Sequence, residues 1–133
     1  MIVLDASVVV DLVLNLEGLA TAARERLRDE DGFAAPEVFD LEVLSAIRRR
    51  ERAGELSSRR ARAAVDAVRE LGVHRVSHDP LIDRIFLLRQ RVSVYDAAYV
   101  ALAEALGVPL ITSDAKLARA MPPGVRVELI SPG

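Results

Sequence analysis

SVYDAAYVALAEALGVPLITSDAKL, residues 93–117, predicts a helix, a tight turn and a buried strand, with one carboxylate at each junction. Gly107 ends the helical pattern because glycine accepts a left-handed cap, and the proline two residues later cannot continue the hydrogen-bond ladder. Residues 108–112 form the expected strand. Asp96 lies in the first turn of the helix, and Asp114 lies just past the carboxyl end of the strand, the edge at which open α/β sheets bind ligands.

Each of these acids also has a purely structural interpretation. Ser93 and Asp96 fit a capping box, in which two side chains satisfy backbone N–H groups at the start of a helix. Asp114 fits an N-cap for the segment that follows it. The argument for function therefore depends on these two acids lying close to other carboxylates in the folded protein.

The composition favours one globular domain over residues 1–133, with a core that needs no metal or disulfide. Half of the residues are hydrophobic, at 51%, but charges interrupt every long apolar run, so a soluble protein is expected rather than a membrane protein. The apolar start, residues 2–16, lacks a basic flank and contains Asp5 and Asp11, so it is a poor export signal. The absence of cysteine excludes disulfides and fits the cytoplasm.

Strands and helices alternate along the chain, which predicts a three-layer α/β/α domain with a mostly parallel central sheet. Pro36 is expected in the first turn of the helix that follows it. The expected strands are residues 1–4, 33–35, 73–77, 108–112 and 125–130, and the expected helices are 8–14, 19–28, 37–52, 58–71, 81–91 and 93–106.

A set of carboxylates is expected at one edge of this sheet. Asp5 and Asp114 follow strands that are far apart in sequence. Asp96 joins them if the first turn of its helix faces the same edge of the sheet. A fourth carboxylate would come from the helix after Pro36. Glu42 and Asp40 both qualify there, and helical periodicity does not choose between them.

At these residues the chain resembles PIN domains, and it is most similar to the VapC-type ribonuclease toxins of bacterial toxin–antitoxin pairs. The resemblance covers nearly the whole chain in the right order, and the part from Asp96 to Asp114 is the most specific. Residues 57–91 match only in their helical character. The motifs that carry the resemblance are residues 2–8 (IVLDASV), 36–47, 93–102 and 110–117.

The resemblance implies an acidic cluster of Asp5, Glu42, Asp96 and Asp114 as both catalytic residues and metal ligands. It also implies two supporting hydroxyl residues, Ser7 and Thr112. The family comparison alone selects Glu42 over Asp40.

Elementary electrostatics agrees with a metal site. Four carboxylates at one sheet edge repel one another, and without a cation some stay protonated near neutral pH. Oxygen-only ligands favour Mg2+ or Mn2+ over Zn2+. Such an ion lowers the pKa of a bound water and shields the charge of a phosphodiester, with a second ion about 3.5–4 Å away in two-metal sites. The residues by themselves thus indicate metal-assisted phosphodiester hydrolysis.

The resemblance further implies cleavage of single-stranded or loop RNA and silencing by a cognate antitoxin. A homodimer and an antitoxin groove are expected because the apolar helix faces of residues 8–14 and 81–88 exceed what one small sheet covers. Tyr95 and Tyr99 are interpreted as core or rim packing rather than as stacking platforms.

The net charge of −2 means that RNA must be held by a local basic patch. Between Ser45 and Arg62 seven arginines stand against two glutamates, and arginine binds phosphate and stacks on bases. The alternative is a solvated helix face with ordinary ion pairs. The seven are Arg48, Arg49, Arg50, Arg52, Arg59, Arg60 and Arg62, of which Arg59, Arg60 and Arg62 are the predicted RNA contacts.

Three other functions are considered. A PIN-like domain without catalysis could serve as a binding or regulatory module, which the intact acids argue against. A receiver-like phosphoacceptor domain also gathers acids at strand ends, but this chain lacks an acid at a central strand end. A haloacid-dehalogenase-like phosphatase needs a second aspartate two residues after Asp5, where Ser7 stands.

Overall fold

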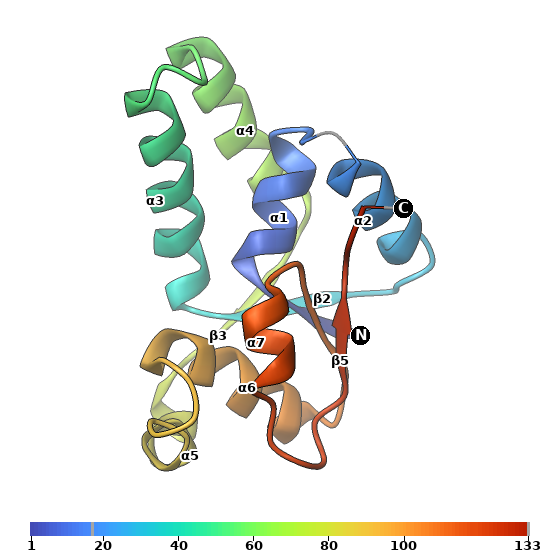
Figure 1. Ribbon diagram of the computed structural model, residues 1–133, viewed down its shortest axis with the longest axis vertical. Helices are drawn as coiled ribbons and strands as arrows, with labels where there is room; N and C mark the ends of the chain where they lie inside the picture. The colour runs from blue at the N-terminus through green and yellow to red at the C-terminus, as the bar shows by residue number, and fades with distance from the viewer. Residues whose placement is uncertain (17, 133) are drawn as a thin grey trace.

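The computed structural model describes residues 1–16 and 18–132, and in it five strands form one parallel sheet between layers of helices (Figure 1). This confirms the expected α/β/α architecture. The strands, β1 (Ile2–Leu4), β2 (Phe33–Pro36), β3 (His74–Val76), β4 (Leu110–Thr112) and β5 (Val127–Leu129), lie in the order β3-β2-β1-β4-β5.

The helices alternate with the strands along the chain, and a 3-10 turn, Asp79–Leu81, precedes the fifth of them. None of the described helices is both long and apolar enough to cross a membrane. They are α1 (Ala6–Val13), α2 (Leu19–Leu27), α3 (Val38–Arg52), α4 (Ser58–Glu70), α5 (Ile82–Leu87), α6 (Val94–Leu106) and α7 (Ala115–Arg119).

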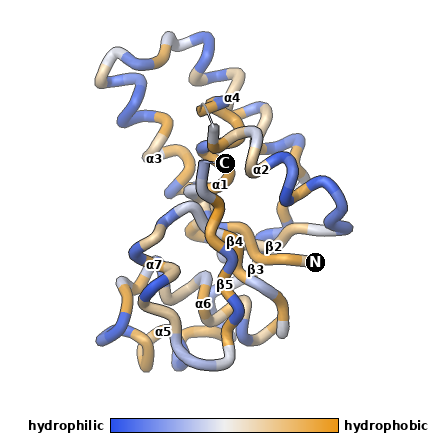
Figure 2. Tube along the Cα trace, turned by 45° about the vertical axis from the view of Figure 1, so that its right-hand side comes forward, coloured by the Kyte–Doolittle hydropathy of each residue, from blue (hydrophilic) through white to orange (hydrophobic). Residues whose placement is uncertain are grey.

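The core lies between the sheet and the helices on its two faces. Helix α6 packs against β1, β2 and β4, while α1 lies on the other side with α2, α3 and α4 around it (Figure 1). Strands β1, β2 and β4 are mainly hydrophobic, whereas the far end of the α3–α4 hairpin is largely hydrophilic (Figure 2). Phe39 and Tyr99 are the largest side chains that are fully buried.

Two apolar helix faces were expected to exceed what the sheet covers, and the structure corrects this for the first of them. Val8, Val9 and Leu14 of the α1 segment are all buried, because α2, α3 and α4 pack around this helix. Around α5, by contrast, Ile82 and Phe86 remain exposed.

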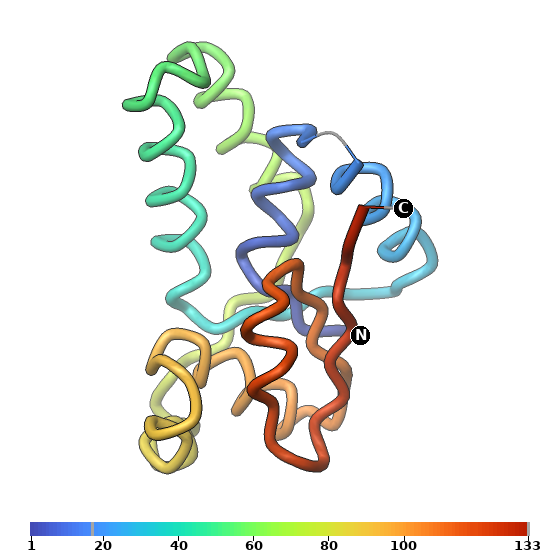
Figure 3. Tube along the Cα trace, viewed as in Figure 1, coloured from blue at the N-terminus to red at the C-terminus, as the bar shows by residue number. Residues whose placement is uncertain are grey.

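The strand order makes β1 the central strand, so Asp5 stands at a central strand end, and the expectation that the chain lacks an acid there was wrong. The end of β1 also lies beside the end of β4. Leu4 pairs with Ile111, and the Asp5 N–H donates to the Ile111 carbonyl over 2.9 Å. After β1 the chain adds β2 and β3 on one side of it, and later adds β4 and β5 on its other side. The direction in which strands are added to the sheet therefore reverses between β1 and β4. Segments from the two ends of the chain therefore lie side by side (Figure 3) at the position where open α/β sheets form ligand crevices.

Two local expectations were wrong. Pro36 is the last residue of β2, opposite Val76, and does not open α3. Proline has no N–H to donate, and it is the N–H of Glu37 that donates to the Val76 carbonyl, over 3.1 Å. Helix α3 instead begins at Val38, whose N–H donates to His78 Nε2 over 3.0 Å. The helix expected over residues 81–91 ends at Leu87. The N–H of Leu88 donates to the carbonyls of both Arg84 and Ile85, four and three residues back. This shared bond tightens the last turn and ends the helix.

Candidate active site

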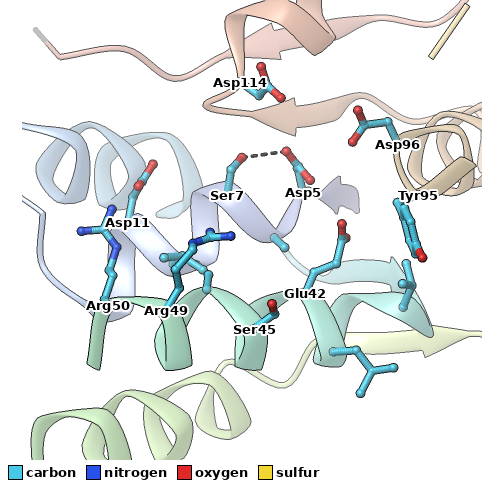
Figure 4. A pocket seen from close by; sticks show the side chains of 15 residues that line it. Asp5, Ser7, Asp11, Glu42, Ser45, Arg49, Arg50, Tyr95, Asp96 and Asp114 are labelled. Carbon is cyan, nitrogen blue, oxygen red and sulfur yellow. Dashed lines mark hydrogen bonds between the residues drawn. The ribbon is translucent and has the colours of Figure 1, made fainter. Parts of the chain in front are cut away.

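The four acids expected to form one cluster line a single cleft of about 640 Å³ (Figure 4). They come from different elements. Asp5 follows β1, Glu42 lies on α3, Asp96 lies in the first turn of α6, and Asp114 precedes α7. The structure therefore brings together side chains that are as many as 109 positions apart.

Asp5 lies at the bottom of the cleft and is only 6% exposed. Its Oδ2 accepts hydrogen bonds from the hydroxyl groups of Ser7 and Thr112, each over 2.7 Å. These are the two hydroxyl residues that the resemblance pointed to, and both contact the first acid directly. They fix the orientation of its carboxylate.

Glu42 faces the cleft, and Asp40 does not. Glu42 Oε1 accepts a 2.7 Å hydrogen bond from the hydroxyl of Tyr99, a side chain that is fully buried in α6. Asp40 instead pairs with Arg75 at 2.7 Å, outside the cleft. The geometry thus separates two residues that helical periodicity left equivalent.

Asp114 has the cap that its local pattern suggested, and Asp96 has half of the suggested capping box, because among the described residues no hydrogen bond joins the Ser93 N–H to the Asp96 carboxylate. The Ser93 hydroxyl accepts the Asp96 N–H over 3.1 Å and caps α6. Asp114 Oδ1 accepts the N–H groups of Lys116 and Leu117 and caps α7. For Asp114 the cap holds the carboxylate in place at the rim of the cleft, so the structural and the functional interpretations are compatible.

Three of these acids share one feature. Asp5, Glu42 and Asp114 are each held through one carboxylate oxygen, Oδ2, Oε1 and Oδ1 respectively. Within residues 1–16 and 18–132, no hydrogen bond ends on the second oxygen of any of the three. Each carboxylate is therefore oriented and still has an oxygen available to a ligand.

This donor set suits a hard divalent cation, because it offers carboxylate oxygens and no sulfur or imidazole. Among the described residues, no three Asp, Glu or His side chains are grouped closely enough to hold a metal ion as they stand. The acids share one cleft and would have to converge on the ion.

Burial and mutual repulsion disfavour charge on three of the acids. Burial raises the pKa of Asp5, the bonds from Ser7 and Thr112 oppose this rise, and the charges of Asp96 and Asp114 add to it. Burial likewise raises the pKa of Glu42, against the hydrogen bond from Tyr99. The pKa of Asp96 is raised by burial and by Asp114, against the bond to Ser93. A bound cation would reverse this preference.

This electrostatic strain predicts that Asp5→Asn stabilises the metal-free protein. A carboxyl group with a raised pKa binds its proton more tightly in the folded state, so its contribution to stability is fully present below its ordinary pKa and is lost as the pH rises through the folded-state pKa. In EDTA, the thermal midpoint of Asp5→Asn should exceed that of the wild type at neutral pH, and the two should converge in acid. Equal midpoints at every pH would contradict the strain.

The cleft is also lined by residues that were not predicted as site residues, and those with charged or aromatic side chains are Asp11, Arg49, Arg50 and Tyr95. Asp11 is 8% exposed, and its Oδ2 has no hydrogen-bond partner among the described residues. Burial raises the pKa of Asp11, while a hydrogen bond with Ser113 and the charge of Arg50 oppose the rise. No motif marks Asp11, whereas the seven-residue spacing from Glu42 to Arg49 could have placed Arg49 on the same helix face.

The arginines predicted to contact RNA lie on α4, and none of them lines the cleft. Arg60 donates to the Leu14 carbonyl over 3.4 Å, Arg62 pairs with Asp66 at 2.5 Å, and Arg59 is exposed. Within the arginine-rich hairpin, Arg49 and Arg50 on α3 are the arginines that border the cleft.

The chain belongs to the PIN domain family, whose family model matches residues 2–121, and within that family it is of the VapC type. Ribonuclease VapC1 of Mycobacterium tuberculosis (strain ATCC 25618 / H37Rv) is 44% identical over 128 residues, which cover 96% of this chain and 94% of the relative. Ribonuclease VapC12 of the same strain is 43% identical over 131 residues, which cover 98% of this chain and all of the relative.

Solved structures share the fold. PAE2754 from Pyrobaculum aerophilum has a TM-score of 0.70 at 21% identity, covering 95% of this chain and 82% of that one. VapC20 of Mycobacterium tuberculosis, a Sarcin-Ricin loop cleaving toxin, has a TM-score of 0.67 at 20% identity, covering 95% and 99%. A toxin–antitoxin complex from Klebsiella pneumoniae has a TM-score of 0.64 at 21% identity, covering 94% and 95%.

Proposed function

We infer that this chain is an endoribonuclease that acts as the toxin of a toxin–antitoxin pair and hydrolyses RNA phosphodiester bonds with the help of Mg2+ or Mn2+. The observation that carries the proposal is the cleft in which Asp5, Glu42 and Asp114 are each anchored through one oxygen and leave the other available. The names of the VapC relatives support the choice of RNA as substrate.

We propose that Asp5, Glu42, Asp96 and Asp114 hold the ion. A bound Mg2+ or Mn2+ supplies a coordinated water of lowered pKa and offsets the charge of the phosphodiester. The protein supplies orientation: Ser7 and Thr112 fix Asp5, and the α7 cap fixes Asp114. Hydrogen bonds already orient the carboxylates of Asp5, Glu42 and Asp114, so metal binding requires chiefly that the four acids converge on the ion.

The same proposal extends to the domain, the location and the partners of the protein. The proposed PIN domain spans residues 1–133 and works in the cytoplasm, for which the absence of cysteine is the supporting feature. A cognate antitoxin silences the enzyme, as the toxin–antitoxin complex of similar fold suggests. A homodimer is also proposed, and the exposed apolar side chains Ile82, Phe86 and Leu87 around α5 are the surface that suits it.

Metal removal tests the proposed chemistry. The purified protein should cleave single-stranded RNA in Mg2+ or Mn2+, and cleavage should fall to background in EDTA and return when the ion is restored in excess. The measurement is the rate of loss of full-length RNA on a denaturing gel. Cleavage at the same rate in EDTA would exclude a metal mechanism, and no cleavage under any condition would favour a silent binding module.

Tyr99→Phe tests whether the orientation of Glu42 matters. The change removes only the hydroxyl that donates to Glu42 Oε1, and loss of a hydrogen bond to a metal-ligating carboxylate commonly costs 10–100-fold in metal affinity or activity. We expect the Mg2+ concentration for half-maximal cleavage to rise by about 10-fold or more. Tyr95→Phe is the matched control, and an equal response of both variants would remove this role for Tyr99.

A further inference from the structure

The cleft extends past the four acids in two directions. Arg49 and Arg50 of α3 lie at one end, Tyr95 of α6 lies at the other, and the acids lie between them (Figure 4). We propose that single-stranded RNA lies along this cleft, with a phosphate on Arg49 and a base stacked on Tyr95. This inference rests on the ribonuclease function proposed above and assigns the substrate contacts that flank its acids.

Arg49 is placed by the geometry of α3. It follows Glu42 by seven residues, or about two helical turns, so both side chains lie on the face of α3 that lines the cleft. Seven residues correspond to about 10.5 Å along the helix axis. Arg49 therefore lies along the cleft from the acids rather than among them, where it can meet a phosphate next to the one being cleaved.

The charges around the two arginines single out Arg49. Arg50 pairs with Glu55 at 3.3 Å, and its charge acts on the buried carboxylate of Asp11. Arg49 is exposed, and no described carboxylate lies within 4.0 Å of its guanidinium. Because an acidic cleft repels RNA, an uncompensated guanidinium at its end is the group that can bind a phosphate, with a fork geometry that suits it.

Tyr95 provides the second contact. It is 60% exposed at the rim beside Asp96, whereas Tyr99, one helical turn further along α6, is fully buried. Within residues 1–16 and 18–132, no hydrogen bond holds the Tyr95 hydroxyl. Proteins bind single strands with little sequence preference by combining basic groups that hold the backbone with exposed aromatic rings on which bases stack, and this cleft has Arg49 at one end and Tyr95 at the other. Tyr95 also borders an apolar groove with Ile82 and Phe86, so the test must separate the two surfaces.

The phosphate contact is tested by the salt dependence of RNA binding. The Asp5→Asn background prevents cleavage, and the affinity for labelled oligoadenylate and oligouridylate is measured in Mg2+ over a range of salt concentrations. Arg49→Ala should reduce the slope of log K against log salt by about 0.7, the value for one phosphate contact on a single strand. Arg48→Ala, an equal change of charge on the same helix outside the cleft, should leave the slope unchanged.

The stacking contact is tested in the same assay. Tyr95→Ala should weaken binding of both oligonucleotides by about fivefold to a hundredfold without changing the salt slope, since one stacked base contributes energy of that size and no charge is removed. Tyr95→Phe should retain the affinity. Phe86→Ala is the matched control, because Phe86 is also 60% exposed and lines only the neighbouring apolar groove.

Two results would overturn the inference while leaving the ribonuclease intact. In both, the wild type cleaves RNA in a metal-dependent way. The first result is an equal salt slope for Arg49→Ala and Arg48→Ala, and the second is an equal affinity for Tyr95→Ala and Phe86→Ala. A wild type that neither binds nor cleaves RNA in Mg2+ or Mn2+ would overturn the proposed function together with the inference.

Discussion

Asp5→Asn should lower metal-dependent RNA cleavage by more than about a hundredfold, because a proposed metal ligand contributes more than the surrounding hydrogen bonds, whose loss typically costs 10–100-fold. Asparagine keeps the shape of aspartate and an oxygen that can accept the bonds from Ser7 and Thr112. The variant loses the charge that attracts a cation and keeps the surrounding structure. The measurement is the initial rate of RNA cleavage at saturating Mg2+.

The same substitution can be followed in cells. Expression of the wild type without its antitoxin should arrest bacterial growth, and expression of Asp5→Asn to the same level should not. The thermal midpoint in EDTA serves as the control for folding, because Asp5→Asn is expected to be at least as stable as the wild type at neutral pH. Equal cleavage by a folded Asp5→Asn variant would exclude the proposed mechanism.

Glu42→Gln should abolish cleavage almost as completely, whereas Asp40→Asn should leave it close to the wild-type rate. The two acids are two positions apart on α3, and each substitution removes one negative charge. Glu42 lies in the cleft and accepts a hydrogen bond from the buried Tyr99, while Asp40 pairs with Arg75 outside it. We expect a loss above about a hundredfold for Glu42→Gln and less than a twofold change for Asp40→Asn, compared at one Mg2+ concentration.

Asp40→Asn has a separate expected effect on stability. Its carboxylate is about half exposed and receives bonds from the Arg75 guanidinium, and exposed ion pairs contribute about 0.2–1 kcal/mol. A small fall in the thermal midpoint with retained activity would fit this role. Equal loss of cleavage in both variants would mean that α3 contributes through its fold rather than through the Glu42 carboxylate.

The positions of Asp5, Asp96 and Asp114 could be predicted from the sequence because each lies at a recognisable boundary between elements. Asp5 comes after a short apolar strand, and Asp96 and Asp114 bracket the helix and strand of residues 93–117. The order of the strands could not be predicted in this way. Only the pairing of β1 with β4 explains why Asp5 and Asp114 share a cleft.

The choice between Glu42 and Asp40 depended on contacts that helical periodicity does not contain. Tyr99 and Arg75, the partners that separate the two acids, are 57 and 35 residues away from them in the chain. The same limitation affects the arginines. Their abundance predicts a basic hairpin, but only the packing of α3 beside α1 shows that Arg49 borders the cleft while Arg59, Arg60 and Arg62 lie outside it.

The most direct test of the proposed metal centre is a crystal structure of the protein grown with Mn2+, in which anomalous scattering locates the ion. We expect a Mn2+ peak in the cleft, coordinated by oxygens of Asp5, Asp96 and Asp114, with Glu42 as a direct ligand or one water away. A cleft without Mn2+ at a concentration that supports RNA cleavage, or an ion bound only elsewhere, would contradict the proposal.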